Sequence, residues 1–404
     1  MPATPALPEP DRAQLAVSQR LAAVLAEAIA AAGGWIGFDD WMARALYTPA
    51  LGYYAGGARK FGAAGDFVTA PELSPVFGQC LAAQCRQWFG HGVPTRIFEF
   101  GAGSGALAAT LIEALAGAGC GPIEYRIVEL SAALRARQRE TLAQRVPEAF
   151  ARVTWLDELP GSIEGVVIGN ELLDAMPVRL FRLDGGQVFE RGVGCTGGPA
   201  PRFAFSERPA APDFAAAVQA TLAASGWATG GGWPDGYCSE LGEQAPAWVA
   251  SVGERLRHGA LLLIDYGFPR AEYYHPQRSQ GTLICHYRHR AHDDPLRWPG
   301  LQDITAHVDF SAIDEAARGA GLAPLGYAAQ AGFLIGCGLA QLAMQVSPAD
   351  AAAWARQAAG LQKLVSEAEM GELFKAIAWG RGLPDDAIGF ADSDRRAALE
   401  RPAC

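Results

Sequence analysis

The sequence has few basic residues for its size and no basic tract. Its 404 residues include 33 Lys and Arg against 43 Asp and Glu, which gives a formal net charge of -10. Non-specific binding to nucleic acid depends on Lys and Arg side chains that neutralise phosphates. This composition therefore argues against nucleic acid as a partner.

Paired cysteines and long apolar segments are also lacking. The eight cysteines are scattered and form no CxxC pair, which indicates reduced thiols rather than a disulfide framework. No segment approaches the length and hydrophobicity of a membrane span, and the N-terminus resembles neither a secretory signal nor an Arg-rich transit peptide. We expect a soluble cytoplasmic protein without membrane insertion.

What the sequence does contain is a regular alternation of apolar runs with helical patterns. Continuous apolar runs that alternate with helices predict a parallel sheet covered on both faces, and so an α/β fold. Five runs have this character: residues 96–100, 125–129, 152–156, 165–169 and 260–264.

The rest of the sequence predicts how the chain divides into three regions. Residues 1–95 combine two helices, expected at 12–32 and 38–46, with a glycine-rich loop. Residues 96–345 hold the sheet, but 175–256 is too long for a plain crossover, and its Asp184-Gly185 pair predicts a hairpin in an inserted subdomain. Residues 346–404 are expected to form a helical C-terminal tail.

The stretch "RIFEFGAGSGALAATLIEAL", residues 96–115, predicts a strand, a tight turn and a helix. Gly101, Gly103 and Gly105 leave the turn without side chains, so a ligand can approach the backbone N–H groups at the helix start. The glycines also fit the relaxed dinucleotide fingerprint, so they do not by themselves choose the ligand.

Acidic or amide residues follow all five predicted strands, where ligands bind in open α/β sheets. Glu129 lies 24 residues after Gly105, about where a carboxylate bridges ribose hydroxyls. An acidic rim suits a cationic ligand better than a pyrophosphate, and S-adenosylmethionine carries a sulfonium and an ammonium group but no phosphate. The rim residues are Glu99, Glu129, Asp157 with Glu158, Asn170 with Glu171, and Asp265.

Five segments together resemble the MidA family of class I methyltransferases, in family order over roughly residues 20–345. They are "GYYAGGARKFGAAGDFVTAPELSPVFG", "FEFGAGSGALA", "GNELLDAMPV", "LLIDYG" and "PGLQDITAHVDF". The resemblance implies a Rossmann-like sheet, S-adenosylmethionine as cofactor, and a protein arginine as acceptor. Mitochondrial members of the family assist the assembly of respiratory complex I, so a symmetrically dimethylated complex I subunit is the implied partner, and a homodimer is implied as well.

The resemblance also implies roles for single residues. The three glycines with Glu99 would hold the methionine part of the cofactor, Glu129 the ribose, and Asp157 with Glu158 would lie at the adenine. Asn170 and Glu171 would line the transfer position. The segment Gly65, Asp66, Phe67, Val68 and Thr69 would close over the site as a lid.

Methyl transfer to arginine needs a nitrogen lone pair in line with the methyl–sulfur axis, although guanidinium stays charged. Carboxylates at Glu171 and Asp174, three residues apart, are expected to grip the guanidinium and to localise its positive charge. Asp174 as a cap of the following turn is the structural alternative. His307, with a pKa near neutrality, and Asp309 are candidates for the proton transfer, against a purely structural histidine.

Other functions remain open at this point. Cys285, His286, His289 and His292 have ligand types and spacing suited to a metal, but methyl transfer requires none, and we expect no metal. The rivals are a methyltransferase for a small molecule, an assembly chaperone that binds the cofactor without catalysis, and an NAD-linked dehydrogenase.

Overall fold

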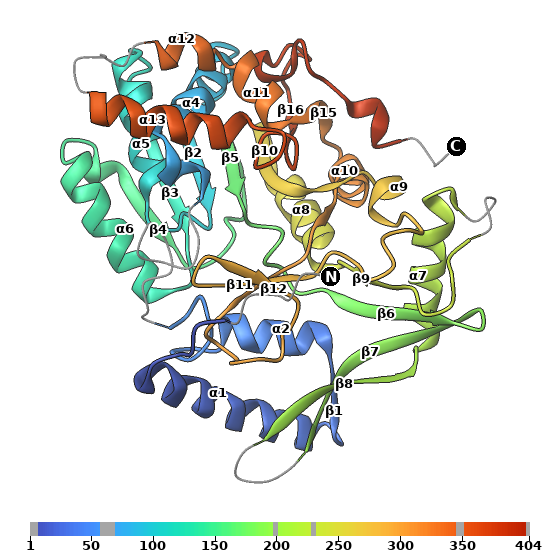
Figure 1. The fold of residues 1–404 in the computed structure, drawn as a ribbon. Coiled ribbons are helices and arrows are strands. Elements are labelled where there is room, and N and C mark those ends of the chain that lie inside the picture. The colour runs from blue at the N-terminus through green and yellow to red at the C-terminus, as the bar shows by residue number, and fades with distance from the viewer. Residues whose placement is uncertain (1–6, 57–68, 197–200, 228–231, 345–350, 401–404) are drawn as a thin grey trace.

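The computed structural model describes residues 7–56, 69–196, 201–227, 232–344 and 351–400. Its centre is an eight-stranded sheet in which five neighbouring strands run parallel (Figure 1). These parallel strands are β4 (Val153–Leu156), β3 (Glu124–Val128), β2 (Arg96–Phe100), β5 (Ile163–Asn170) and β10 (Leu256–Phe268). All five coincide with the predicted runs to within a few residues, and the α/β fold is confirmed.

Two more strands extend the sheet beyond β10: β16 (Phe374–Arg381), antiparallel to β10, and then β15 (Ala323–Ala329), antiparallel to β16. A short strand, β14 (Val308–Asp309), also pairs with β10. The prediction of a helical tail over 346–404 is wrong for β16, which lies inside the central sheet. Its apolar run carries no period that distinguishes a helix from a strand, and pairing with two neighbouring strands decides between them.

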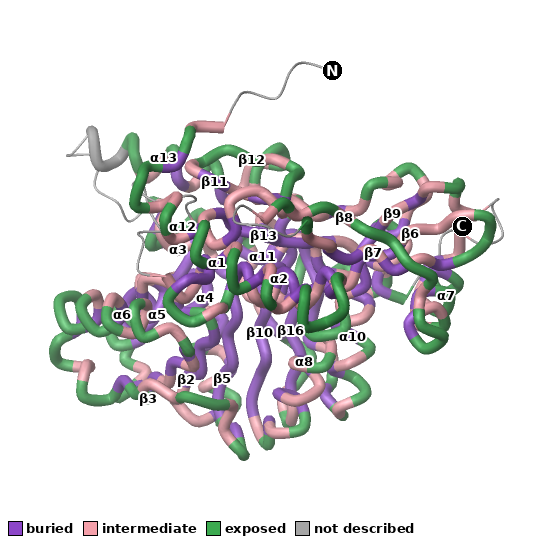
Figure 2. Tube along the Cα trace, turned by 90° about the horizontal axis from the view of Figure 1, so that it is seen from below, coloured by how far each residue is buried: buried purple, intermediate pink, exposed green. Residues whose placement is uncertain are grey.

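Alternate strand residues face two apolar layers, as expected for a sheet that is covered on both sides. On β10, Leu262 and Ile264 face one layer, and Leu261 and Leu263 face the other. The first layer contains α4 (Pro75–Gly90), α5 (Ala106–Gly117), α6 (Ala132–Arg145), α11 (Gln330–Gly336) and part of α13 (Ala351–Val365). The second contains α8 (Gln244–Arg255) and α10 (Phe310–Gly319), and Figure 2 shows β2, β5 and β10 as buried segments between the layers.

A second sheet is built mostly from the inserted residues. Its strands are β6 (Arg179–Asp184), β7 (Gln187–Thr196), β8 (Arg202–Pro209) and β9 (Cys238–Leu241), packed on α7 (Pro212–Ala224). The hairpin at Asp184-Gly185 is confirmed by the pairing of Asp184 with Gln187. The fifth strand, β1 (Trp35–Gly37), comes from the N-terminal region and pairs with β7, so the two regions share one sheet.

The N-terminal helices α1 (Arg12–Ala31) and α2 (Phe38–Tyr47) share an apolar core with this second sheet and with a three-stranded sheet. The three strands are β11 (Ile284–Tyr287), β12 (Arg290–His292) and β13 (Asp303–Thr305). The short elements are α3 (Ala70–Leu73), α9 (Arg270–Tyr273), α12 (Leu339–Ala343), η1 (Phe150–Arg152), η3 (Ile388–Phe390) and η4 (Arg396–Ala398).

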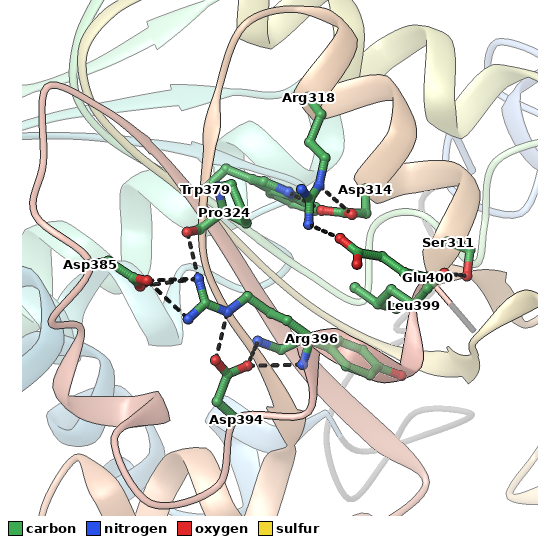
Figure 3. A network of polar contacts seen from close by, with 11 residues as sticks. Ser311, Asp314, Arg318, Pro324, Trp379, Asp385, Asp394, Arg396, Leu399 and Glu400 are labelled. Carbon is green, nitrogen blue, oxygen red and sulfur yellow. Dashed lines mark hydrogen bonds and ion pairs between the residues drawn. The ribbon is translucent and has the colours of Figure 1, made fainter.

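The last described segment covers the outer edge of β15. The Arg395 N–H donates to the Tyr327 carbonyl at 2.6 Å, and the Tyr327 N–H donates to the Asp394 carboxylate at 3.2 Å. The Arg396 guanidinium reaches the Pro324 carbonyl at 2.8 Å and also bonds Asp385 and Asp394 (Figure 3). An edge that would otherwise leave backbone groups unpaired is thereby closed.

No helix among the described residues is both long enough and apolar enough to cross a bilayer.

Candidate active site

A cavity of about 1210 Å³ opens at the carboxyl ends of the parallel strands. The strand ends form one side of it. Other parts of the chain contribute to the walls, among them Tyr47 and Tyr54 of the N-terminal region, Ile284, His286 and Asp303 of the three-stranded sheet, and Met370, Leu373 and Phe374 around the start of β16. In Figure 1, α2 and β11 lie on the side of the central sheet where these strands end.

The glycine turn joins β2 to α5 as predicted. Gly101, Gly103 and Gly105 have φ of 68°, 51° and 83°, a region that side chains with a Cβ rarely adopt. Gly101 and Gly103 line the cavity. Gly105 does not: it is the left-handed N-cap of α5, and a Cβ there would lie 3.3 Å from the Cα of Gln138. Its role is to let α5 pack against α6.

Glu99 and Glu129 lie at the ends of β2 and β3, and both carboxylates are buried at the cavity. Glu99 accepts a hydrogen bond of 2.7 Å from the Tyr125 hydroxyl, and burial raises its pKa to about 7. Glu129 accepts bonds from the Ser131 N–H at 2.8 Å and from the Gln138 amide at 3.1 Å. Burial raises the pKa of Glu129 as well. Both carboxylates are thus oriented by neighbours and face the cavity.

Asp157 and Glu158 differ from these two because they lie in solvent at the cavity mouth. The side chain of Asp157 is 87% exposed and forms an ion pair of 2.8 Å with Arg135. Arg135 also donates to the carbonyls of Glu129 and Leu156, so it ties the ends of β3 and β4 together. Exposed ion pairs of this kind contribute little to stability. The shape of the cavity mouth alone, and not a strong charge interaction, places Asp157 and Glu158 beside a ligand.

The turn after β5 carries three of the predicted residues. Asn170 donates to the Glu171 carboxylate at 3.1 Å, and the Ala70 N–H donates to the same oxygen at 3.3 Å. Burial, reinforced by the charge of Asp174, raises the pKa of Glu171 to about 8. Burial raises the pKa of Asp174 to about 6, against a hydrogen bond from Tyr266 that lowers it. Within the described residues, the buried Oδ1 atoms of Asn170 and Asp174 have no hydrogen-bond partner.

His307 lines the same cavity, whereas Asp309 does not. The His307 ring lies edge-on to Tyr266 and Phe268, each at 5.1 Å, and its buried Nδ1 has no partner among the described residues. Burial lowers its pKa to about 4, so the expectation of a near-neutral pKa is wrong. Asp309 instead caps α10 through the N–H groups of residues 311 and 312 and forms an ion pair of 3.2 Å with Arg270.

Of the predicted lid, only Thr69 belongs to the described residues, and it lines the cavity. Gly65, Asp66 and Phe67 lie outside them. In the stretch with metal-like spacing, His286 lines the cavity, but in the described parts of the chain no three His, Cys, Asp or Glu side chains are grouped as metal ligands.

Sequence reasoning missed a second group of cavity residues. Asp303 is buried and accepts a hydrogen bond of 2.8 Å from the Tyr54 hydroxyl. The Tyr47 ring stacks on Tyr54 with centroids 5.6 Å apart, and Tyr266 comes from the end of β10. Asp303 and Tyr266 stand within motifs that carry the family resemblance, but only the folded chain brings them to the strand ends.

The charge of the cavity is strongly one-sided. Among the lining residues that the structure describes there is no Lys or Arg, and Arg135, outside the lining, pairs with the exposed Asp157. Seven acidic side chains contribute: Glu99, Glu129, Asp157, Glu158, Glu171, Asp174 and Asp303. A ligand that carries positive charge would relieve this arrangement.

Comparisons with known proteins identify the family to which this site belongs. A family of S-adenosyl-L-methionine-dependent methyltransferases matches residues 80–328, which include the glycine turn and the turn after β5. A crystal structure of a COG1565 superfamily member from Burkholderia thailandensis, bound to S-adenosyl-homocysteine, is 50% identical. It superimposes with a TM-score of 0.91 over 98% of this chain and 100% of that chain. This chain belongs to the MidA family of methyltransferases.

Curated relatives agree with this family. The mitochondrial protein arginine methyltransferase NDUFAF7 of Mus musculus is 27% identical over 399 residues, which cover 91% of this chain and 85% of the mouse protein. The Homo sapiens protein of the same name is 26% identical over the same shares of both chains. The chain is therefore a methyltransferase that uses S-adenosylmethionine, and the dehydrogenase alternative is removed.

The residues present fit this cofactor. The glycine turn offers backbone without side chains, and the uncompensated acids suit a sulfonium and an ammonium group. The cofactor supplies the methyl group and the driving force, since the sulfonium carbon is already activated. What this methyltransferase itself has to provide is alignment, exclusion of water and a place for one proton.

Proposed function

We propose that this methyltransferase transfers the methyl group of S-adenosylmethionine to a guanidinium nitrogen of an arginine in a partner protein. The observation that supports this most directly is the buried, unpartnered Oδ1 of Asp174, beside Glu171 and Asp303, in a cavity with no cation among its described lining residues. A guanidinium brings five N–H donors and a fixed positive charge, which match these acceptors.

The cofactor side of the proposal follows the strand ends. Gly101 and Gly103, with Glu99, hold the methionine part, and Gly105 shapes the turn. Glu129 accepts the ribose hydroxyls. Asp157 and Glu158 lie at the adenine, and Thr69 belongs to the lid that the resemblance implies.

The acceptor side belongs to the turn after β5. Asn170, Glu171 and Asp174 orient the guanidinium so that one nitrogen faces the methyl carbon. In the transfer the carbon–sulfur bond breaks, a carbon–nitrogen bond forms, and the nitrogen loses one proton. In the empty protein burial raises the pKa of Glu171 to about 8, and the positive charge of the bound guanidinium favours its carboxylate form, which takes this proton. His307 is neutral at pH 7 and accepts a hydrogen bond from the acceptor through Nδ1.

Symmetric dimethylation, a respiratory complex I subunit as acceptor and a homodimer are carried over from the family as proposals. A cytoplasmic location is proposed from the scattered, unpaired cysteines of the sequence. The mitochondrial relatives named as arginine methyltransferases support a protein acceptor.

The test is transfer of isotopically labelled methyl groups into a protein extract from cells that lack this methyltransferase. After acid hydrolysis, mass spectrometry should find labelled symmetric dimethylarginine with the wild-type protein and not with Glu171→Gln. Label recovered only in small molecules would favour the small-molecule alternative, and cofactor binding without any transfer would favour the chaperone alternative.

A further inference from the structure

The turn that carries Glu171 and Asp174 has an unfavourable backbone. Glu171 has φ of 50°, in the left-handed region that residues other than glycine seldom occupy. Its N–H donates to the Ile264 carbonyl at 2.8 Å, which fixes the start of the turn on β10. Such a conformation persists only where the surroundings hold it in place.

One buried carboxylate holds the rest of this turn. The Oδ2 atom of Asp265, in β10, accepts the N–H groups of Leu172 at 3.0 Å, Leu173 at 2.8 Å and Asp174 at 3.3 Å. Its Oδ1 atom accepts the N–H of Tyr266 at 2.9 Å. Asp265 is 1% exposed, so all four bonds form away from solvent.

These bonds require a carboxylate in particular. Both oxygens of Asp265 face N–H donors, so the NH₂ group of an asparagine would meet a donor on one side or the other. Lys375 lies opposite Asp265 in the β10–β16 register, but its ammonium donates to the carbonyls of Glu372 and Leu373. The backbone N–H groups therefore stabilise the charge of Asp265 in place of a cation, against the burial that raises its pKa.

Asp265 does not line the cavity, although Glu171, Asp174 and Tyr266 around it do. We propose that Asp265 is a positioning residue for methyl transfer, which fixes the turn so that Glu171 and Asp174 point at the transferred group. This inference rests on the proposed function of those two carboxylates.

The test uses sinefungin, a cofactor analogue that carries an amine where S-adenosylmethionine carries its methyl group, so no acceptor protein is needed. Calorimetric affinities for sinefungin and for S-adenosyl-homocysteine are compared in each variant, and their ratio isolates contacts at the transfer position. In the wild-type protein sinefungin should bind more tightly, by about tenfold, because its ammonium group meets Glu171 and Asp174.

Asp265→Asn should lose most of this preference while its affinity for S-adenosyl-homocysteine stays within about twofold of the wild-type value, since the glycine turn and Glu129 are intact. Asp265→Glu keeps the charge but moves it, and should lose the preference too. Asp314→Asn, a buried aspartate outside the cavity, should keep it, which separates positioning from general destabilisation.

The possible outcomes distinguish the positioning role of Asp265 from the proposed function. If both Asp265 variants still bind sinefungin more tightly than S-adenosyl-homocysteine, the positioning role is overturned and the proposed function is unaffected. A wild-type protein without any preference overturns the assignment of Glu171 and Asp174 to the transfer position, and the role of Asp265 with it. If Asp265→Asn does not fold, the comparison of Asp265→Glu with the wild type decides.

Discussion

Two regions of this methyltransferase treat acidic side chains in opposite ways. The buried Asp314 of α10 accepts the Trp379 indole N–H at 2.8 Å and the Arg318 guanidinium at 2.7 Å (Figure 3). At the strand ends, Glu171 and Asp174 share a cavity without a described Lys or Arg in its lining.

The difference shows which acids serve stability and which serve binding. Removing a carboxylate that already has its cation leaves that cation unpaired and destabilises the fold, and such a carboxylate has little charge left for a ligand. A buried carboxylate without a cation costs free energy in the empty protein, which a cationic ligand can repay. Substitutions of these acids should therefore affect either binding or stability, according to the region.

The largest effect is expected from Glu171→Gln. Loss of the base and of one carboxylate at the transfer position should lower the rate of methyl transfer by about 100-fold or more. Calorimetry should find the affinity for S-adenosylmethionine nearly unchanged. Glu164→Gln, at the other end of the same strand and exposed, is the matched control. Equal losses of rate and of cofactor affinity would move Glu171 into the cofactor site.

Asp314→Ala should produce the opposite pattern. It leaves the Trp379 N–H and the Arg318 charge without their partner, which should lower the free energy of unfolding by about 3 kcal/mol. Urea titration followed by tryptophan fluorescence measures this, and cofactor affinity at low temperature should not change. Asp392→Ala, at an exposed aspartate in the last described segment, should cost almost nothing.

The pH dependence of stability offers a third test. The folded protein raises the pKa of Glu171 to about 8 and that of Asp174 to about 6, both above their usual values. The stability that these groups contribute is therefore fully present below their usual pKa values and is lost as the pH rises towards 8.

Glu171→Gln removes one of these titrations. The variant without cofactor should melt a few degrees higher than the wild-type protein at about pH 8.5, and the gain should be much smaller at about pH 5. Differential scanning calorimetry at the two pH values checks this. If the gain in melting temperature is the same at both pH values, ionisation of Glu171 does not cause the pH dependence of stability.

The smallest effect is expected from Asp157→Asn. Because its ion pair with Arg135 is exposed, the affinity for S-adenosylmethionine should change by less than about threefold. Glu129→Gln, at the buried end of the next strand, should weaken binding by at least about tenfold. A large loss of affinity in Asp157→Asn would mean that the exposed rim also contributes to cofactor recognition, although solvent surrounds it.

Much of the fold was predictable, because the five parallel strands are continuous apolar runs and the hairpin at Asp184-Gly185 has a local signal. The strand β16 was not, since its run carries no distinguishing period. Within the site, Glu99, Glu129 and Glu171 were recognisable because each stands at the carboxyl end of a strand. Asp303 lies in β13 and Tyr54 in a turn after α2, and Asp309, which the sequence predicts for catalysis, caps a helix.

The sequence by itself determined the order of strands and helices, the glycine turn and the acids at the strand ends, because these depend on neighbours within a few residues. Only the tertiary structure decided which acids receive a partner. Asp265 and Asp174 are both buried aspartates at the carboxyl ends of the parallel strands. Asp265 accepts four backbone N–H groups, whereas the Oδ1 atom of Asp174 has no partner among the described residues and is left for a ligand. Distances across strands set that difference, and they arise only when β5 and β10 lie side by side.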